Sequence, residues 1–166
     1  SESLQSRDVQ ALVAGISQAR GQFSALPSVK DEVKGIGQWL PSSQLLDSDF
    51  TRNAITYKLT NNPVNIVHLA THGQFSSNFD ETFFLTWDDT ININELAEIL
   101  QSRATNQQSA IELLTLSACE TARGDDRAVL GLAGLAVRSG ARSTIATLWP
   151  IKDDVAKQLM ITFYRH

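Results

Sequence analysis

The chain has 166 residues, a hydrophobic fraction of 42% and a formal net charge of -4. This length suits a single domain that buries its apolar surface without disulfides or a structural metal. The acidic charge provides no basic surface, so nucleic-acid binding is not expected. No uncharged run reaches the length of a membrane span, and the first residues lack the layout of a signal peptide, so no membrane contact is expected either.

The chain contains one cysteine and three histidines. One cysteine cannot form an internal disulfide, and the set is too small for a zinc site built from pairs of Cys and His. The composition therefore favours a reducing, cytoplasmic setting and predicts no metal.

The two ends of the chain suggest how it is divided. Residues 1–25 are expected to form an N-terminal helical segment and linker, and residues 26–166 the main domain. Within the first segment, apolar residues recur every three or four positions between Asp8 and Phe23, which predicts an amphipathic helix. The last residues, 155–166, stop inside a helical pattern without a Gly or Pro terminator, so we expect a domain that is truncated at its C-terminus.

The next residues predict helices that alternate with a strand. Ser28 is a candidate cap for a helix whose apolar positions continue to Leu40. A short strand is expected at 45–46. Asp49 or Thr51 then caps a second helix, which ends near the Asn-Asn-Pro sequence at 61–63.

The second half of the chain continues the alternation. An apolar run at 64–71 predicts a strand that breaks at His72-Gly73, and a second run, from Ile111, predicts a strand that ends near Cys119. Strands and helices alternate to the end, so the sequence predicts a three-layer α/β/α fold with a mainly parallel sheet. The remaining predicted elements are a hairpin at 82–90, a helix capped by Asn92 or Asn94, a solvated loop at 103–109, a buried helix at 128–139 closed by Gly140, a strand at 143–149 and the final helix.

The candidate catalytic residues are Cys119 and His72, which stand at the ends of two predicted strands. In open α/β sheets the working groups lie beyond the carboxyl ends of the strands. A thiolate attacks an acyl carbon when a nearby base ionises it and backbone N–H groups receive the oxyanion. Gly73 and Cys119 itself are the candidate oxyanion donors. A lone cysteine at a strand end is about as often a buried small hydrophobe, so residue types alone leave both interpretations open.

Three stretches resemble the CHAT domain, a caspase-like cysteine peptidase family associated with tetratricopeptide repeats and placed in the clan of caspases, metacaspases and separase. They are HLATHG at 68–73, LSACETA at 116–122 followed by Gly124-Asp125, and residues 131–154. The resemblance extends from about Leu26 onward. His72 also precedes Cys119 by about 50 residues, as the histidine does in caspases.

The resemblance implies a caspase-like fold and a cysteine endopeptidase that needs no cofactor. It makes His72 the catalytic histidine, Cys119 the nucleophile, and Gly73 with Cys119 the oxyanion donors. Ser-Ala-Cys-Glu-Thr replaces the Gln-Ala-Cys-x-Gly of caspases, so aspartate specificity is not implied. The expected partners are a protein or peptide substrate and a tetratricopeptide-repeat region of the same or another chain. The alternative is a catalytically silent interaction or scaffold module.

Several acidic or basic side chains near these motifs have competing interpretations. In separase a similar Leu-Trp stretch precedes an aspartate that recognises arginine, which makes Asp153 the candidate substrate-binding residue; Asp153 or Asp154 would otherwise cap the final helix. His68 shares a strand face with His72, but a hydrogen-bonded core histidine is the expected role. Glu120 either orients the loop beside Cys119 or is solvated. Adjacent carboxylates at 125–126 without further ligands do not predict a metal site.

Overall fold

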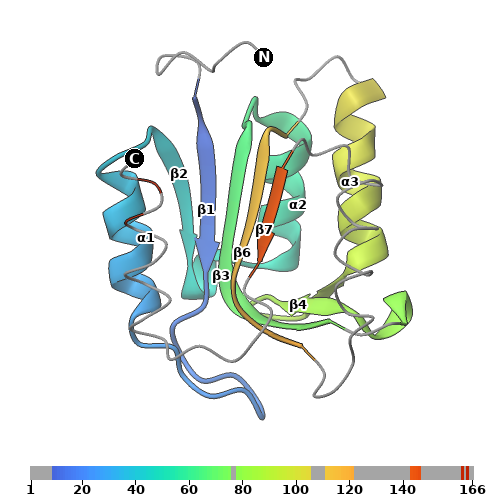
Figure 1. The fold of residues 1–166 in the computed structure, drawn as a ribbon. Coiled ribbons are helices and arrows are strands. Elements are labelled where there is room, and N and C mark those ends of the chain that lie inside the picture. The colour runs from blue at the N-terminus through green and yellow to red at the C-terminus, as the bar shows by residue number, and fades with distance from the viewer. Residues whose placement is uncertain are drawn as a thin grey trace.

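The computed structural model describes residues 9–75, 78–105, 111–121 and 143–146, together with Thr162 and Tyr164. These residues form one mixed α/β unit around a seven-stranded sheet (Figure 1). The strands are β1 (Ala11–Gly15), β2 (Ser42–Leu46), β3 (Ile66–Phe75), β4 (Phe83–Leu85), β5 (Thr90–Asn92), β6 (Leu113–Thr121) and β7 (Ser143–Ala146). The α-helices are α1 (Val29–Gly37), α2 (Arg52–Asn61) and α3 (Ile93–Thr105), and short 3-10 turns lie at Asp47–Asp49 and Phe79–Glu81.

The sheet combines a parallel part with an antiparallel hairpin. Strand β1 pairs in parallel with β2 and β3, β3 pairs in parallel with β6, and β6 pairs in parallel with β7. The hairpin β4–β5, which the sequence predicts, adds to β3 in the antiparallel sense. The sheet is therefore mixed, with its parallel part as expected.

The first described segment corrects the prediction of a helix over 8–23. Ala11–Gly15 is strand β1, it lies between β2 and β3, and all five residues are buried. A strand covered on both faces is a continuous apolar run, and such a run also contains apolar residues at helical spacings. The periodicity alone therefore could not distinguish a helix from a buried strand. The segment before residue 26 contributes β1 to the same sheet as the later strands.

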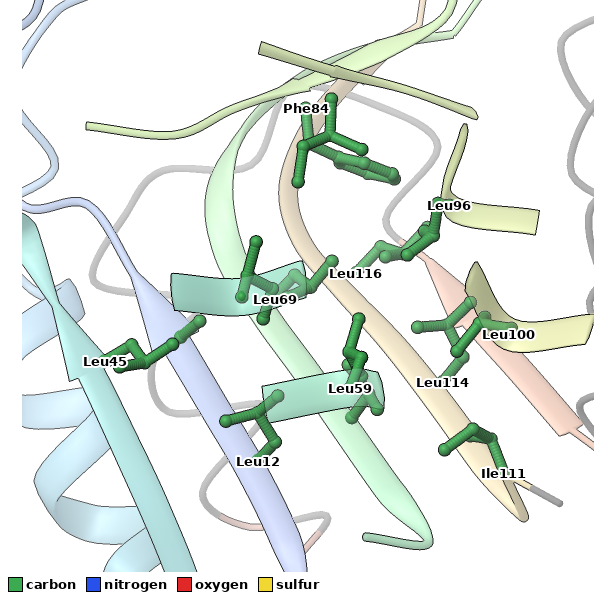
Figure 2. Packing of buried hydrophobic residues seen from close by; sticks show 14 of the residues in the cluster. Leu12, Leu45, Leu59, Leu69, Phe84, Leu96, Leu100, Ile111, Leu114 and Leu116 are labelled. Carbon is green, nitrogen blue, oxygen red and sulfur yellow. The ribbon is translucent and has the colours of Figure 1, made fainter. Parts of the chain in front are cut away.

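Two hydrophobic clusters cover the two faces of β1. Leu12 and Ala14 belong to a cluster that includes residues of α2 and α3, whereas Ala11 and Val13 belong to a cluster with residues of α1. Figure 2 shows part of the first cluster, in which Leu12, Leu69 and Leu116 of the sheet lie next to Leu59 of α2 and Leu96 and Leu100 of α3. The alternation along one strand thus places α1 opposite α2 and α3, and it explains why β1 carries no polar face.

The helix caps agree in part with the sequence. The Oγ1 atom of Thr51 accepts the N–H of Ala54 at 3.1 Å, so Thr51 is the cap of α2. Asn92 caps α3 by accepting the N–H of Asn94 at 2.8 Å. Helix α1 begins after Ser28 as predicted, but Ser28 has helical backbone angles and its side chain makes no capping hydrogen bond.

Two predictions in the second half are confirmed as far as the structure extends. Strand β7 covers the first four residues of the strand expected at 143–149, and Thr162 and Tyr164 are helical as predicted for the end of the chain. The predicted helix at 128–139, its cap at Gly140 and the residues of 147–154 lie outside the described residues.

The predicted loop at 103–109 is wrong at its start, because α3 continues through Thr105 and the Arg103 side chain is 1% exposed. Its guanidinium donates to the carbonyl of Leu59, to that of Asn62 at 2.9 Å and to that of Val64 at 2.6 Å. These acceptors surround the C-terminal end of α2, where a cation is favourable and the last carbonyls lack helical partners. Arg103, on the neighbouring helix α3, therefore caps the C-terminal end of α2.

We expect Arg103→Met to lower the free energy of unfolding by about 2–4 kcal/mol, because buried carbonyl groups lose a charged donor. Arg103→Lys should lose less, since an ammonium retains some of these bonds. Urea denaturation measures both effects, with the exposed Lys30→Met as the matched control. Equal stabilities of the Arg103→Met and Lys30→Met proteins would contradict this assignment.

Candidate active site

The register of β3 and β6 brings the two predicted catalytic segments together. The strands pair from Ile66 opposite Leu113 to Ala70 opposite Ser117, and pairing then resumes with Gly73 opposite Cys119. Strand β3 therefore has one more residue than β6 within this interval. Such an irregularity is a β-bulge, which bends a strand and changes the direction of its side chains.

The pairing of β3 corrects two expectations about this edge of the sheet. The strand predicted to break at His72-Gly73 continues to Phe75, because β4 pairs with Gly73 and Gln74. Alternation along a regular strand would place His68 and His72 on one face, but the extra residue between Ala70 and Gly73 interrupts that alternation.

Cys119 lies inside β6, which ends at Thr121, rather than just beyond a strand. Its backbone is the partner of Gly73, and adjacent strands are separated by about 4.8 Å. The two candidate oxyanion donors are thus direct backbone neighbours. The side chains of Cys119 and Glu120 lie outside the described part of the structure, as do Asp153, Asp154 and the pair at 125–126.

His72 is partly exposed and is oriented by the loop that follows β1. Its Nε2 atom lies 2.9 Å from the backbone oxygen of Ser24. A carbonyl can only accept a hydrogen bond, so Nε2 carries a proton and the neutral ring has its lone pair on Nδ1. No described residue is hydrogen-bonded to Nδ1. The Phe23 ring lies against the imidazole, with ring centroids 5.3 Å apart.

This arrangement is suited to a general base, which needs an orienting partner on one nitrogen and an accessible lone pair on the other. The roles of Ser24 and Phe23 could not be predicted from the sequence. No motif marks Ser24, because every residue type provides the carbonyl that orients the histidine.

Asp47 fixes the start of the loop that holds His72. Its Oδ1 accepts the N–H of Ser17 at 2.7 Å and that of Gln18 at 3.2 Å, while Oδ2 accepts the Ser17 hydroxyl at 2.6 Å. Asp47 is buried and has a left-handed φ of 52°, which Asp tolerates better than most residues. One carboxylate at the end of β2 therefore satisfies three donors at the end of β1.

The same loop then reverses direction in a tight turn. Arg20 and Phe23 exchange backbone hydrogen bonds of 3.0 and 2.9 Å, and Gly21 between them has a φ of 56°. Glycine adopts this conformation without steric cost. The turn presents Phe23 to His72, and the following residue supplies the carbonyl.

A buried polar network lies deeper in the same strands and confirms that His68 is a hydrogen-bonded core histidine. His68 is 0% and Glu32 2% exposed, and the His68 Nε2 lies 2.8 Å from Oε2 of Glu32. The His68 Nδ1 lies 3.0 Å from the Tyr164 hydroxyl, which donates to Oγ1 of Thr115 at 2.8 Å. The Ser117 hydroxyl donates to Oε1 of Glu32 at 3.2 Å.

The donors and acceptors of this network determine where its protons lie. Burial raises the pKa of Tyr164 above its ordinary value, so the hydroxyl stays protonated. Because that proton is directed to Thr115, the hydroxyl accepts from Nδ1–H of His68. Nε2 and the Glu32 carboxyl then share one further proton, as an imidazolium–carboxylate pair or as its neutral equivalent. The network ties α1 to β3 and to β6 two residues before Cys119.

Neither a metal site nor a membrane span is found among the residues described. No group of three or more His, Cys, Asp or Glu in that part of the chain could hold a metal ion. None of its helices has the length and apolar character required to cross a bilayer.

We expect Asp47→Ala to lower the free energy of unfolding by about 1–3 kcal/mol, because buried donors of Ser17 and Gln18 lose their acceptor. Hydrogen exchange of the amides at 17 and 18 should become faster at the same time. Asp47→Asn is the matched control, since it keeps an acceptor oxygen and tolerates the left-handed backbone. Unchanged exchange in the alanine variant would show that the loop does not depend on this carboxylate.

A double-mutant cycle on Glu32 and His68 tests the buried network. Each single substitution, Glu32→Leu or His68→Leu, leaves a buried polar partner and should cost about 3–5 kcal/mol. The double variant should lose less than the sum, with a coupling of at least about 1 kcal/mol in urea denaturation. Glu32→Gln provides a milder variant if a leucine variant does not fold. Additive losses would argue against a direct interaction.

Comparison with known protein families identifies the family of this chain. The model of the CHAT domain matches residues 1–166. A search of curated proteins gave no match. The family match thus includes β1 and its loop as well as the strands that carry His72 and Cys119. The sequence resemblance to this caspase-like, peptidase-related group is confirmed, and the chain belongs to the CHAT domain family.

Proposed function

We propose that the chain is a cysteine endopeptidase that cleaves a protein substrate through Cys119 and His72. One observation carries the proposal: the β3–β6 register makes Gly73 the backbone partner of Cys119, beside a histidine whose Nε2 is hydrogen-bonded to a carbonyl. A scaffold without catalysis has no need for an imidazole oriented in this way. The described fold provides the rigid parallel strands on which such a site can be built.

In the proposed reaction, Nδ1 of His72 accepts the proton of the Cys119 thiol, and the thiolate attacks the scissile carbonyl carbon. The N–H groups of Gly73 and Cys119 receive the negative oxygen. His72 then gives its proton to the departing amine, and water hydrolyses the acyl-enzyme. The Ser24 carbonyl keeps the imidazole in the tautomer that this sequence of proton transfers requires. No cofactor takes part.

Several finer features belong to the same proposal. The placement of α1 opposite α2 and α3 supports a caspase-like three-layer sandwich. Asp153 is proposed to bind a basic substrate side chain before the cut, as the resemblance to separase implies. We further propose a cytoplasmic protein regulated by a tetratricopeptide-repeat region of the same or another chain.

The proposal is tested with internally quenched peptide libraries and the full chain. Cys119→Ala should abolish cleavage, and His72→Ala should reduce it by about 10²–10⁴-fold because a general base is lost. Since Cys119 is the only cysteine, iodoacetamide labelling reports on it alone. Labelling at neutral pH should be faster than in the unfolded chain and slower in His72→Ala.

Circular dichroism of both variants controls for folding. Library cleavage that persists in Cys119→Ala would rule out this nucleophile. A thiol that reacts more slowly than in the unfolded chain, without cleavage of any library, would favour the scaffold function.

A further inference from the structure

An open pocket lies beside the candidate site and has no role in the chemistry described so far. It has a volume of about 370 Å³ and lies between the turn after β1 and the turn that joins β4 to β5. Figure 1 shows these two segments at the same end of the sheet. The pocket is lined by Arg20, Gly21, Gln22, Phe23 and residues 85–90.

The walls of the pocket combine aromatic rings with an acidic rim. Phe23 and Trp87 supply aromatic surface, while Asp88 and Asp89 are exposed. The Arg20 guanidinium is already engaged, because it lies 3.9 Å from the centre of the Trp87 ring and its Nε donates to the Trp87 carbonyl at 3.2 Å. The Arg20 guanidinium, although it belongs to the lining, therefore stacks on the Trp87 ring.

The carboxylates of Asp88 and Asp89 each have an oxygen atom that can accept a hydrogen bond from a ligand. Oδ1 of Asp88 accepts the N–H of Arg52 at 3.0 Å, and Oδ1 of Asp89 accepts the N–H of Thr90 at 2.8 Å. Within the described residues, Oδ2 of neither group is hydrogen-bonded. The nearby Arg52 guanidinium pairs with Glu95 and donates to the Thr90 carbonyl at 2.8 Å, so its one positive charge is shared between Glu95 and the two rim carboxylates. Hydrogen bonding by the Arg52 N–H lowers the pKa of Asp88, so it stays ionised at neutral pH.

The sheet order places this pocket on a definite side of His72. Strand β6, with Cys119, lies along one edge of β3, while β1 and then β4 lie along the other edge. Both turns that line the pocket belong to this second edge. Phe23 forms part of the lining and also contacts the imidazole. His72 therefore stands between the nucleophile segment and the pocket.

We propose that this pocket binds an arginine or lysine side chain of the substrate, on the segment that follows the scissile bond. The inference rests on the proposed peptidase function. The histidine protonates the departing amine, so the departing segment runs on the far side of His72 from Cys119. An extended peptide advances about 3.3 Å per residue. The Phe23 ring, which lines the pocket, lies 5.3 Å from the His72 ring, so we assign the pocket to the second or third residue after the cut. The aliphatic stem of that residue packs on Phe23, and its cationic end meets the Asp88–Asp89 rim.

The test compares internally quenched peptide libraries in which the second or third position after the cut is fixed as Arg, Lys, Gln or Glu. We expect at least about a tenfold higher kcat/KM for Arg or Lys than for Glu, a preference that decreases with added salt. Asp89→Asn should reduce the ratio of kcat/KM for Arg to kcat/KM for Glu by about two- to fivefold, which is the effect of one exposed ion pair. The matched control is Glu98→Gln on the exposed surface of α3, which removes the same charge elsewhere and should leave the ratio as it is.

Binding of the uncleaved peptides to the Cys119→Ala chain separates this inference from the proposed function. Fluorescence anisotropy with labelled Arg-fixed and Glu-fixed libraries should show the same preference and the same loss in Asp89→Asn. If Cys119-dependent cleavage is absent but this preference is present, the peptidase proposal fails and the pocket remains a cation site. Equal binding of both libraries, or a preference that Asp89→Asn leaves intact, overturns the pocket assignment.

Discussion

The parallel pairing of β3 with β6 is the constraint on which the rest of the structure depends. It places Gly73 opposite Cys119, directly after the irregularity in β3 that contains His72. Regular pairing below the bulge is supported from both faces, by the apolar cluster around Leu69 and Leu116 and by the polar network on the other side. A slip of one residue would exchange these two faces, so the buried groups fix the register and, with it, the site.

The sequence could predict those features that depend on local patterns. Apolar runs interrupted by His-Gly and by Ala-Cys predict the strands of the site, and Thr51 is one of the two predicted caps of α2 because short polar side chains favour helix starts. The strand β1 was missed because an apolar run buried on two faces has no diagnostic period. Arg103 and Asp47 were missed for a different reason. Their partners lie on other elements, so only the folded chain shows that a charged side chain in each place is buried and hydrogen-bonded to the backbone.

The polar network around His68 and Glu32 restricts the arrangement of the core more than apolar packing alone would. It joins α1, β3, β6 and the residue Tyr164 near the end of the chain. Each of its members has a definite partner, so a shifted helix or strand would leave a donor or acceptor unpaired in a desolvated place. The network therefore restricts how α1 can lie against the two strands of the candidate site.

The hydrogen bond between His72 and the backbone of Ser24 has a consequence for the evolution of this site. A carboxylate that orients a histidine must be kept through every substitution, but a main-chain carbonyl is supplied by all twenty amino acids. Residue 24 is therefore free to drift among relatives, provided that the loop keeps its path. Two family members with quite different residues here would still hold the imidazole in the same tautomer, and comparison of their sequences would not reveal what orients it.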